Sequence, residues 1–153
     1  MKGLSQSIFS SVFPAQKKYL ASPSKSFISN LILSYRNVFL LPSRQDFEYY
    51  VYSAPSSIVI KKLVSQSPLH TVSGIRTPKL EKLLVDLIAD SDFYYSYQGN
   101  ERTTLFRNAF SQYQVSLKTL YRYAQRRKCR QELEAYLHQN QILPASAGER
   151  GLL

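Results

Sequence analysis

Two pairs of carboxylates have a spacing that could support metal-dependent chemistry. Asp46 and Glu48 are separated by one residue, and so are Asp90 and Asp92. Paired carboxylates can hold the metal ions used in nucleotidyl transfer, but that reaction also needs a glycine- and serine-containing turn that grips phosphate. Neither pair follows such a turn. We therefore interpret both pairs as structural: Asp46 caps a helix, and Asp90 and Asp92 lie where a helix ends.

The other residue types that serve in catalysis are few. Cys129 is the single cysteine, and His70 and His138 lie far apart in the sequence, which leaves no local spacing for a disulfide framework or a zinc site. His70 falls in a predicted strand. Basic neighbours would acidify the Cys129 thiol, but its position fits packing on a helix. No nucleophile elbow, phosphate-binding glycine loop or zinc-protease motif occurs. We expect a protein that is not an enzyme and uses no metal or cofactor.

Anion binding is the chemistry that the segment from Arg102 to Gln131 indicates. This segment contains no Asp or Glu, and its cations form the predicted interaction face: Arg102, Arg107, Lys118, Arg122, Arg126, Arg127, Lys128 and Arg130. Such a cluster can contact phosphates, and Tyr121 and Tyr123 lie within it as candidates for stacking on bases. The alternative is that the cations only solubilise the outer face of packed helices, the last ones near helix carbonyl ends.

The composition agrees with a folded domain that favours acidic partners. The chain has 153 residues, of which 44% are hydrophobic, and a formal net charge of +10. A chain of this length buries roughly 70% of its unfolded surface, so one core is expected. Positive charge attracts nucleic acid over long range. No stretch approaches the roughly 20 apolar residues of a membrane span, and no secretory apolar segment is present, so we expect a cytoplasmic protein.

The first half of the chain predicts short helices and a small sheet. A short helical face recurs at Phe27, Ile28, Leu31 and Ile32, and a buried strand follows over residues 37–41. Ser43 and Asp46 form a capping box, which opens a helix with Phe47, Tyr50 and Val51 on one face. A further strand is predicted over residues 58–64, where Lys61 and Lys62 stand between apolar residues, and a second short extended piece over residues 69–72. Which of these strands pair is left open.

The second half predicts successive helices. Thr77 is the expected cap of the first, with Pro78 at its first position, and its apolar face is Leu80, Leu83, Leu84, Leu87 and Ile88. After the break at residues 98–100, Asn100 is the expected cap of a helix with the inner face Leu105, Phe106, Ala109, Phe110 and Tyr113. Ser116 is the expected cap of the next.

The apolar stripe of that next helix fails at residues 127, 128 and 131 and resumes out of phase at Cys129. This predicts a break from Arg126 to Lys128 and a final helix that ends near Gln139. The predicted fold class is therefore α+β, a small β-sheet followed by a C-terminal bundle of three to four helices. We expect a poorly specified segment at residues 1–26, a single domain at 27–140 and a flexible tail at 141–153.

Several motifs in order resemble the C-terminal region of AbiEi-like antitoxins of type IV toxin–antitoxin systems. They cover roughly residues 27–138 and comprise VFLLPS, TPKLEKLLVDLIAD, YQGNE, FRNAFSQY and LYRYAQRR. The first block of the C-terminal half rests on Thr77, Pro78, Leu80, Glu81, Leu84, Val85 and Asp86, and the basic block on Leu120, Tyr123, Ala124, Arg126 and Arg127. The family usually places glycine after the double arginine, where this chain has Lys128.

The resemblance implies a non-catalytic protein of an abortive infection system. Its functional counterpart would be a nucleotidyltransferase-like toxin, with which such antitoxins are not expected to form a stable complex. The family also carries an N-terminal winged helix that binds DNA, for which residues 1–36 show no pattern, so the resemblance implies a truncated or a degenerated relative. The alternative is a transcriptional regulator that binds nucleic acid through the basic helical face.

Overall fold

The computed structural model describes residues 25–34, 37–54 and 57–143. The chain divides into two compact units, Met1–Lys79 and Leu80–Leu153. Among the described residues, the strands all lie in the first unit and four successive α-helices lie in the second, which confirms the predicted α+β class. The predicted tail from Pro144 and nearly all of the predicted N-terminal segment lie outside the described residues. The single domain expected over residues 27–140 stays a prediction.

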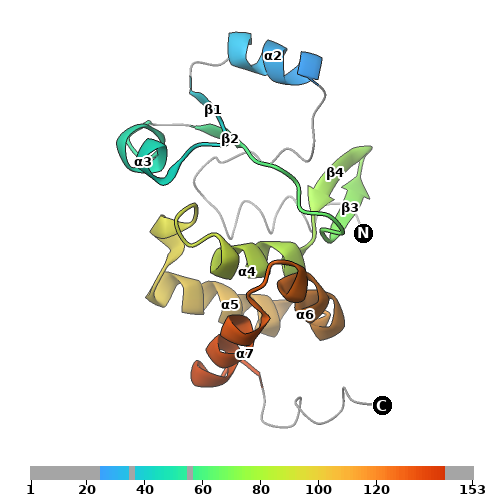
Figure 1. Cartoon of the computed structure of the whole chain (residues 1–153). Helices are drawn as coiled ribbons and strands as arrows, with labels where there is room; N and C mark the ends of the chain where they lie inside the picture. The colour runs from blue at the N-terminus through green and yellow to red at the C-terminus, as the bar shows by residue number, and fades with distance from the viewer. Residues whose placement is uncertain (1–24, 35–36, 55–56, 144–153) are drawn as a thin grey trace. The chain divides into compact units, whose positions relative to one another are not determined.

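The first unit contains a short parallel pair of strands joined through a helical segment. After helix α2 (Lys25–Ser34), strand β1 (Val38–Leu40) pairs in parallel with β2 (Ile58–Ile60), with Val38 opposite Ile58 (Figure 1). Parallel strands need a crossover connection, and this one contains a helix. Strand β1 confirms the strand predicted at residues 37–41, and the pairing that the sequence left open is thereby settled.

The crossover helix begins with the predicted capping box. In α3 (Arg44–Asp46), the Asp46 backbone N–H donates to Ser43 Oγ at 3.2 Å, and the Ser43 backbone N–H donates to Asp46 Oδ2 at 2.7 Å. The backbone and hydroxyl hydrogen bonds from Ser43 lower the pKa of Asp46 because they favour the carboxylate. Asp46 therefore has the structural role that its spacing predicted.

The helix then widens into a π-helix, η1 (Phe47–Val51), in which the Tyr52 backbone N–H donates to the Phe47 carbonyl at 3.1 Å. Phe47 and Val51 are buried, but Tyr50 is 61% exposed. The predicted apolar face was thus wrong at Tyr50. An i→i+5 hydrogen bond changes the angular spacing of side chains, so the α-helical period does not apply here.

An antiparallel hairpin closes the first unit. Strands β3 (Leu69–Val72) and β4 (Ile75–Pro78) pair with Val72 opposite Ile75, and the two-residue turn has φ 51° at Ser73 and 79° at Gly74. Two positive φ angles are what a type I′ turn requires. The predicted helix start at Thr77 and Pro78 was therefore wrong, because both residues belong to β4. The strand predicted over residues 58–64 is shorter than expected, because β2 ends at Ile60 and residues 61–64 form no strand.

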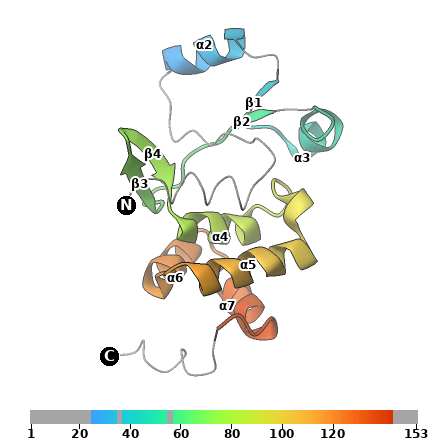
Figure 2. The same ribbon diagram turned by 180° about the vertical axis from the view of Figure 1, so that it is seen from behind.

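The second unit is built around helix α4 (Leu80–Ala89). A short 3₁₀ turn, η2 (Tyr95–Tyr97), leads to α5 (Asn100–Gln112), α6 (Leu117–Arg126) and α7 (Arg130–Gln139). Helix α4 contacts each of these three helices, and Figures 1 and 2 show it lying beside α5. Within the described part of the chain, no helix is long and apolar enough to cross a lipid bilayer.

The core of the second unit comes from all four helices. All eight residues from Glu81 to Ile88 are buried, and the largest apolar side chains packed with them are Phe106, Leu120, Leu133 and Leu137, each 0% exposed. The predicted α4 face therefore lies in the core. Burial on every side of α4 exceeds the one-sided stripe that its leucines predicted, and it brings charged residues inside.

The helix ends only partly follow the predicted signals. Ser116 caps α6 as predicted, since its Oγ accepts from the Thr119 backbone N–H at 3.3 Å. The expected Asn100 cap was wrong: Gly99 is the N-cap of α5, with φ 68°, and Asn100 is the first helical residue. A glycine tolerates this left-handed conformation without a Cβ clash.

The predicted break between the last two helices is a Schellman motif. The Cys129 N–H donates to the Ala124 carbonyl at 3.1 Å, the Lys128 N–H donates to the Gln125 carbonyl at 3.1 Å, and Lys128 has φ 58°. This position usually holds glycine. Helix α7 ends in the same way, with Gln141 at φ 52°. Both predicted limits, the break at residues 126–128 and the end at Gln139, are confirmed.

Candidate functional site

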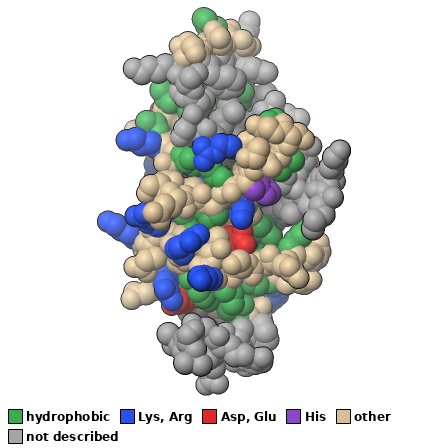
Figure 3. Space-filling model, turned by 90° about the vertical axis from the view of Figure 1, so that its right-hand side faces the viewer, with side chains coloured by type: hydrophobic (Ala, Val, Ile, Leu, Met, Phe, Trp, Pro, Cys, Tyr) green, Lys and Arg blue, Asp and Glu red, His purple; other side chains and the backbone are tan. Residues whose placement is uncertain are grey.

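The exposed side of α6 carries a stripe of cations. Lys118, Arg122 and Arg126 follow at intervals of four residues and are all exposed, whereas Leu120 and Ala124 are buried on the inner side. Residues four apart are neighbours on a helix surface. Helix α6 contains no acidic residue. On the face of the molecule in Figure 3, lysine and arginine side chains are far more numerous than acidic ones. We call Lys118, Arg122 and Arg126 the α6 stripe.

The α6 stripe costs the helix stability when no ligand is bound. Like charges four residues apart destabilise a helix by about 0.2–0.5 kcal/mol per pair, and the stripe contains two such pairs. The last cation, Arg126, offsets part of this destabilisation because it lies near the negative carbonyl end of the helix. A bound anion would weaken the repulsion between these cations. The stripe is thus a surface whose electrostatics favour an anionic partner.

Arg127, the neighbour of the last stripe residue, points the opposite way. Its Nη2 lies 2.7 Å from Asp90 Oδ1 and its Nη1 lies 3.7 Å from Asp86 Oδ1, and its side chain is 15% exposed. Burial lowers the pKa of Arg127, but attraction to Asp86 and Asp90 outweighs this and raises it overall. Arg127 was predicted as part of the interaction face. It is instead an internal cation that ties the end of α6 to α4.

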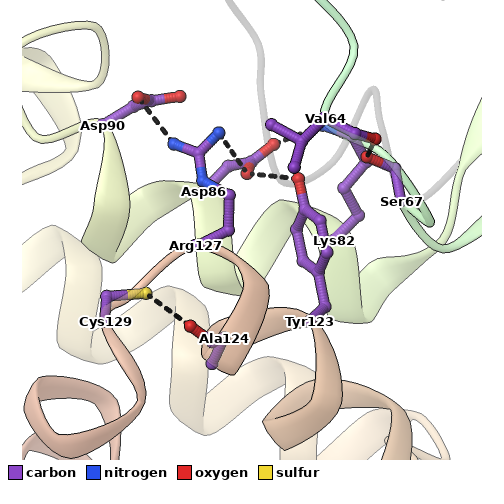
Figure 4. Close-up of polar contacts among 9 residues, drawn as sticks. All are labelled: Val64, Ser67, Lys82, Asp86, Asp90, Tyr123, Ala124, Arg127 and Cys129. Atoms are coloured by element: carbon purple, nitrogen blue, oxygen red, sulfur yellow. Dashed lines mark hydrogen bonds and ion pairs between the residues drawn. The ribbon is translucent and has the colours of Figure 1, made fainter.

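Asp86 is the centre of a buried polar network (Figure 4). It is 1% exposed, Lys82 pairs with its Oδ2 one helical turn away, and the Tyr123 hydroxyl donates to its Oδ1 at 3.0 Å. Together with Arg127, these groups surround one carboxylate with two cations and a hydroxyl. We call Lys82, Asp86, Asp90, Tyr123 and Arg127 the Asp86 network. Tyr123 is 1% exposed, so this predicted stacking residue presents no ring to a base.

A second buried carboxylate fixes the other end of α6. Glu81 is 7% exposed, and its Oε1 accepts from the backbone N–H of Ser116 at 2.9 Å. Ser116 is the N-cap of α6. Helix α6 is therefore attached to α4 at its start through Glu81 and at its end through Arg127. These two attachments set the rotation of α6, and that rotation determines that the α6 stripe faces solvent.

Two other predicted cations hold α5 near α7. The Arg102 guanidinium lies over the Tyr136 ring, with Cζ 4.5 Å from the centroid, and its Nη1 donates to Gln98 Oε1 at 2.8 Å. Arg107 remains exposed, but its Nη2 donates to the Asn140 carbonyl at 3.3 Å. Both residues are thus part of the contact between helices, and neither lies on α6.

The remaining predicted residues lie at the junction of the last two helices. Lys128 is exposed in the left-handed position between them. The Arg130 guanidinium lies over the Tyr121 ring at 5.2 Å, and its Nε donates to Glu134 Oε1 at 2.8 Å. Tyr121 is half-buried. The structure therefore brings Tyr121 and Arg130 together beside the α6 stripe, whereas Tyr123 and Arg127 turn inward.

The residues considered for catalysis have structural positions. Asp90 pairs with Arg127, and His70 lies in strand β3 opposite Thr77. Cys129 is buried, and burial raises the pKa of its thiol to about 11, although the charge of Arg127 opposes the shift. The acidified thiol considered from the sequence is therefore wrong. The described residues contain no group of three or more His, Cys, Asp or Glu side chains arranged to hold a metal ion.

These features define an α+β protein with a basic helical surface. Residues 22–143 match the family of unknown function DUF6577, and the chain belongs to that family. No curated protein and no solved structure shows significant similarity to it. The resemblance to AbiEi-like antitoxins therefore stays a prediction.

Replacing Asp86 with Asn should destabilise the protein strongly. The amide keeps the shape of the side chain but leaves the charges of Lys82 and Arg127 without this carboxylate, and breaking a buried pair costs about 3–5 kcal/mol. Glu134→Gln is the matched control, because the Arg130–Glu134 pair is partly exposed and such pairs contribute at most about 1 kcal/mol. Urea unfolding followed by circular dichroism compares the two. Equal losses for both variants would contradict the role given to Asp86.

Cys129 should resist thiol reagents in the folded protein. The thiolate is the reactive form, so a pKa raised to about 11 lowers its fraction at every pH below that value. At pH 8 we expect labelling by a disulfide reagent to be about 100-fold slower than in the urea-unfolded chain. Stopped-flow absorbance measures both rates, and Cys129→Ser gives the unreactive baseline. Equal rates in the two states would refute the burial argument.

Proposed function

We propose that this chain is a non-catalytic protein that binds nucleic acid, and that the α6 stripe contacts the phosphate backbone. The observation that supports this most is the alignment of Lys118, Arg122 and Arg126 on one exposed helix face without an acidic residue on that helix. The charge of the whole chain, +10, adds long-range attraction for the same class of partner.

The length of the α6 stripe suits several phosphates. Arg126 lies eight positions after Lys118, and a helix rises 1.5 Å per residue, so the stripe extends about 12 Å. One strand of a duplex presents a phosphate about every 3.4 Å along its axis, so about three phosphates lie within this length. The length of the stripe is therefore sufficient for several phosphate contacts.

The proposed interface is narrower than the basic face that the sequence predicted. Arg127 is paired with acids inside the protein, and Arg130 is paired with Glu134 on α7. Helix α7 also carries an exposed Glu132. The basic segment without acidic residues that the structure presents to solvent is therefore limited to helix α6.

An antitoxin role is the second candidate function. It is supported by the order of the motifs from VFLLPS to LYRYAQRR, which resembles the C-terminal region of AbiEi-like antitoxins over roughly residues 27–138. In this proposal the protein acts in the bacterial cytoplasm and counters a nucleotidyltransferase-like toxin without a stable complex. The single cysteine suits a reducing compartment.

Reversing the charges of the α6 stripe should abolish binding. The full chain is titrated by fluorescence anisotropy against labelled mixed-sequence DNA and RNA over a range of salt concentrations. Three phosphate contacts predict a log–log salt slope of about −2 to −3. We expect Arg122→Glu/Arg126→Glu to bring the slope close to zero and to weaken binding at least about 10-fold at low salt.

The matched control is Arg76→Glu/Lys79→Glu. It makes the same change in net charge at two exposed cations outside α6, so it tests whether general charge or the α6 stripe governs affinity. The control should retain most of the binding and its salt slope. Equal losses in the two double variants would contradict a local interface, and absence of salt-sensitive binding in the native chain would refute the nucleic-acid proposal.

The antitoxin candidate predicts a rescue of growth. Expression of a nucleotidyltransferase-like toxin encoded beside this chain should arrest a bacterial culture, and co-expression of the chain should restore growth. Colony counts measure the outcome, and Asp86→Asn, which should destabilise the fold, serves as the inactive control. Persistent arrest while the native chain accumulates in soluble form would count against this role.

A further inference from the structure

We infer that the nucleic acid bound by this protein is single-stranded, an inference that rests on the binding function proposed for the α6 stripe. The observation behind it is the contact between Tyr121 and Arg130 next to that stripe. The Arg130 guanidinium lies over the Tyr121 ring, 5.2 Å from Cζ to the centroid. The ion pair between Arg130 Nε and Glu134 Oε1, at 2.8 Å, restrains that guanidinium. We call Tyr121 and Arg130 the stacking pair.

The stacking pair borders the cations that would hold the backbone. Tyr121 lies three residues after Lys118 and directly before Arg122, and residues three apart are neighbours on a helix surface. The Tyr121 ring is half-buried, whereas the Arg130 side chain is 46% exposed. A strand whose phosphates lie along the α6 stripe would therefore carry its bases close to the stacking pair.

The geometry favours unpaired bases over a duplex. In a duplex the bases are stacked on each other, and side chains reach only their edges in the grooves. In a single strand the bases can turn outward and stack on aromatic rings or on arginine guanidinium planes. Tyr121 is held against the protein by burial and by Arg130, so its ring cannot insert between stacked base pairs. A guanidinium that is already restrained needs little further ordering to receive a base.

The charge state of Tyr121 is compatible with this role. Burial and the Glu134 carboxylate raise the pKa of Tyr121, and Arg130 opposes them less strongly. The phenol therefore stays neutral at physiological pH and does not repel phosphate. Tyr123, the other tyrosine considered for stacking, is committed to Asp86, so Tyr121 is the tyrosine of α6 that can support a base, through the guanidinium that lies over its ring.

Three probes of equal length test the inference with the full chain. A labelled mixed-sequence single strand of about 20 nucleotides, the same sequence as a duplex, and an abasic strand with the same phosphates but no bases are compared by fluorescence anisotropy at one low salt concentration. We expect the normal single strand to bind at least about 10-fold more tightly than either of the others. A duplex or an abasic strand that binds as tightly as the normal strand overturns the inference.

Substitutions assign the effect to the stacking pair. Tyr121→Leu should weaken binding of the normal single strand by about 5- to 150-fold. It should also reduce the difference in affinity between the normal and the abasic strand. Tyr121→Phe keeps the ring and should retain that difference. Tyr95→Leu, at a tyrosine that is 70% exposed outside α6, is the matched control. A Tyr121→Leu protein that keeps the full advantage over the abasic strand refutes the role of the stacking pair.

Two further outcomes separate this inference from the proposed function. Salt-sensitive binding of equal strength to all three probes, lost in Arg122→Glu/Arg126→Glu, would support the α6 stripe and overturn the preference for single strands. If none of the probes binds in a salt-sensitive manner, both ideas fail. Because the abasic comparison uses the native chain, the inference can be tested even if a Tyr121 variant does not fold.

Discussion

The neutralisation of one buried carboxylate is the interaction on which the C-terminal unit depends. Asp86 is 1% exposed and lies among Lys82, Tyr123 and Arg127. A buried charge is tolerated only when it is paired and hydrogen-bonded. Here Lys82 and Arg127 neutralise Asp86, and Arg127 also pairs with Asp90. An apolar replacement of the whole network could stabilise the fold equally well. The charged network instead fixes an orientation. The Arg127 side chain at the end of α6 must reach Asp86 and Asp90, and this sets the rotation of the helix.

The rotation of α6, which internal contacts set, determines which of its residues face solvent. Arg126 and Arg127 are adjacent in sequence, yet consecutive residues on a helix do not share a face. Once Asp86 and Asp90 bind Arg127, and Glu81 binds the Ser116 backbone, Arg126 and the cations one and two turns before it must lie on the outer side. The α6 stripe thus follows from contacts made by other residues. Its mutual repulsion is tolerated because the two attachments and the buried Leu120 hold the helix in place.

The sequence predicted the parts of this structure that depend on local patterns. The apolar period found α4, the failed stripe located the break after α6, and the Ser43 capping box was correct. The errors have a common cause, which is competition from longer-range or backbone effects. Thr77 and Pro78 look like a helix start but pair with β3, because Ser73 and Gly74 form a type I′ turn, which a serine–glycine pair favours.

The candidate site was half predictable for a similar reason. Composition located the basic segment, but it could not tell which arginines meet internal acids, since Asp86 lies about forty residues before Arg127 and only packing joins them. A usable signal was present: Lys82 and Asp86, four residues apart, lie on a helix with leucines on several sides, where a charged pair must be buried. A buried Lys82–Asp86 pair would in turn indicate a third group that completes the polar network. The doublet Arg126–Arg127 lies at the end of α6. At a helix end, one guanidinium can point inward while its neighbour faces solvent.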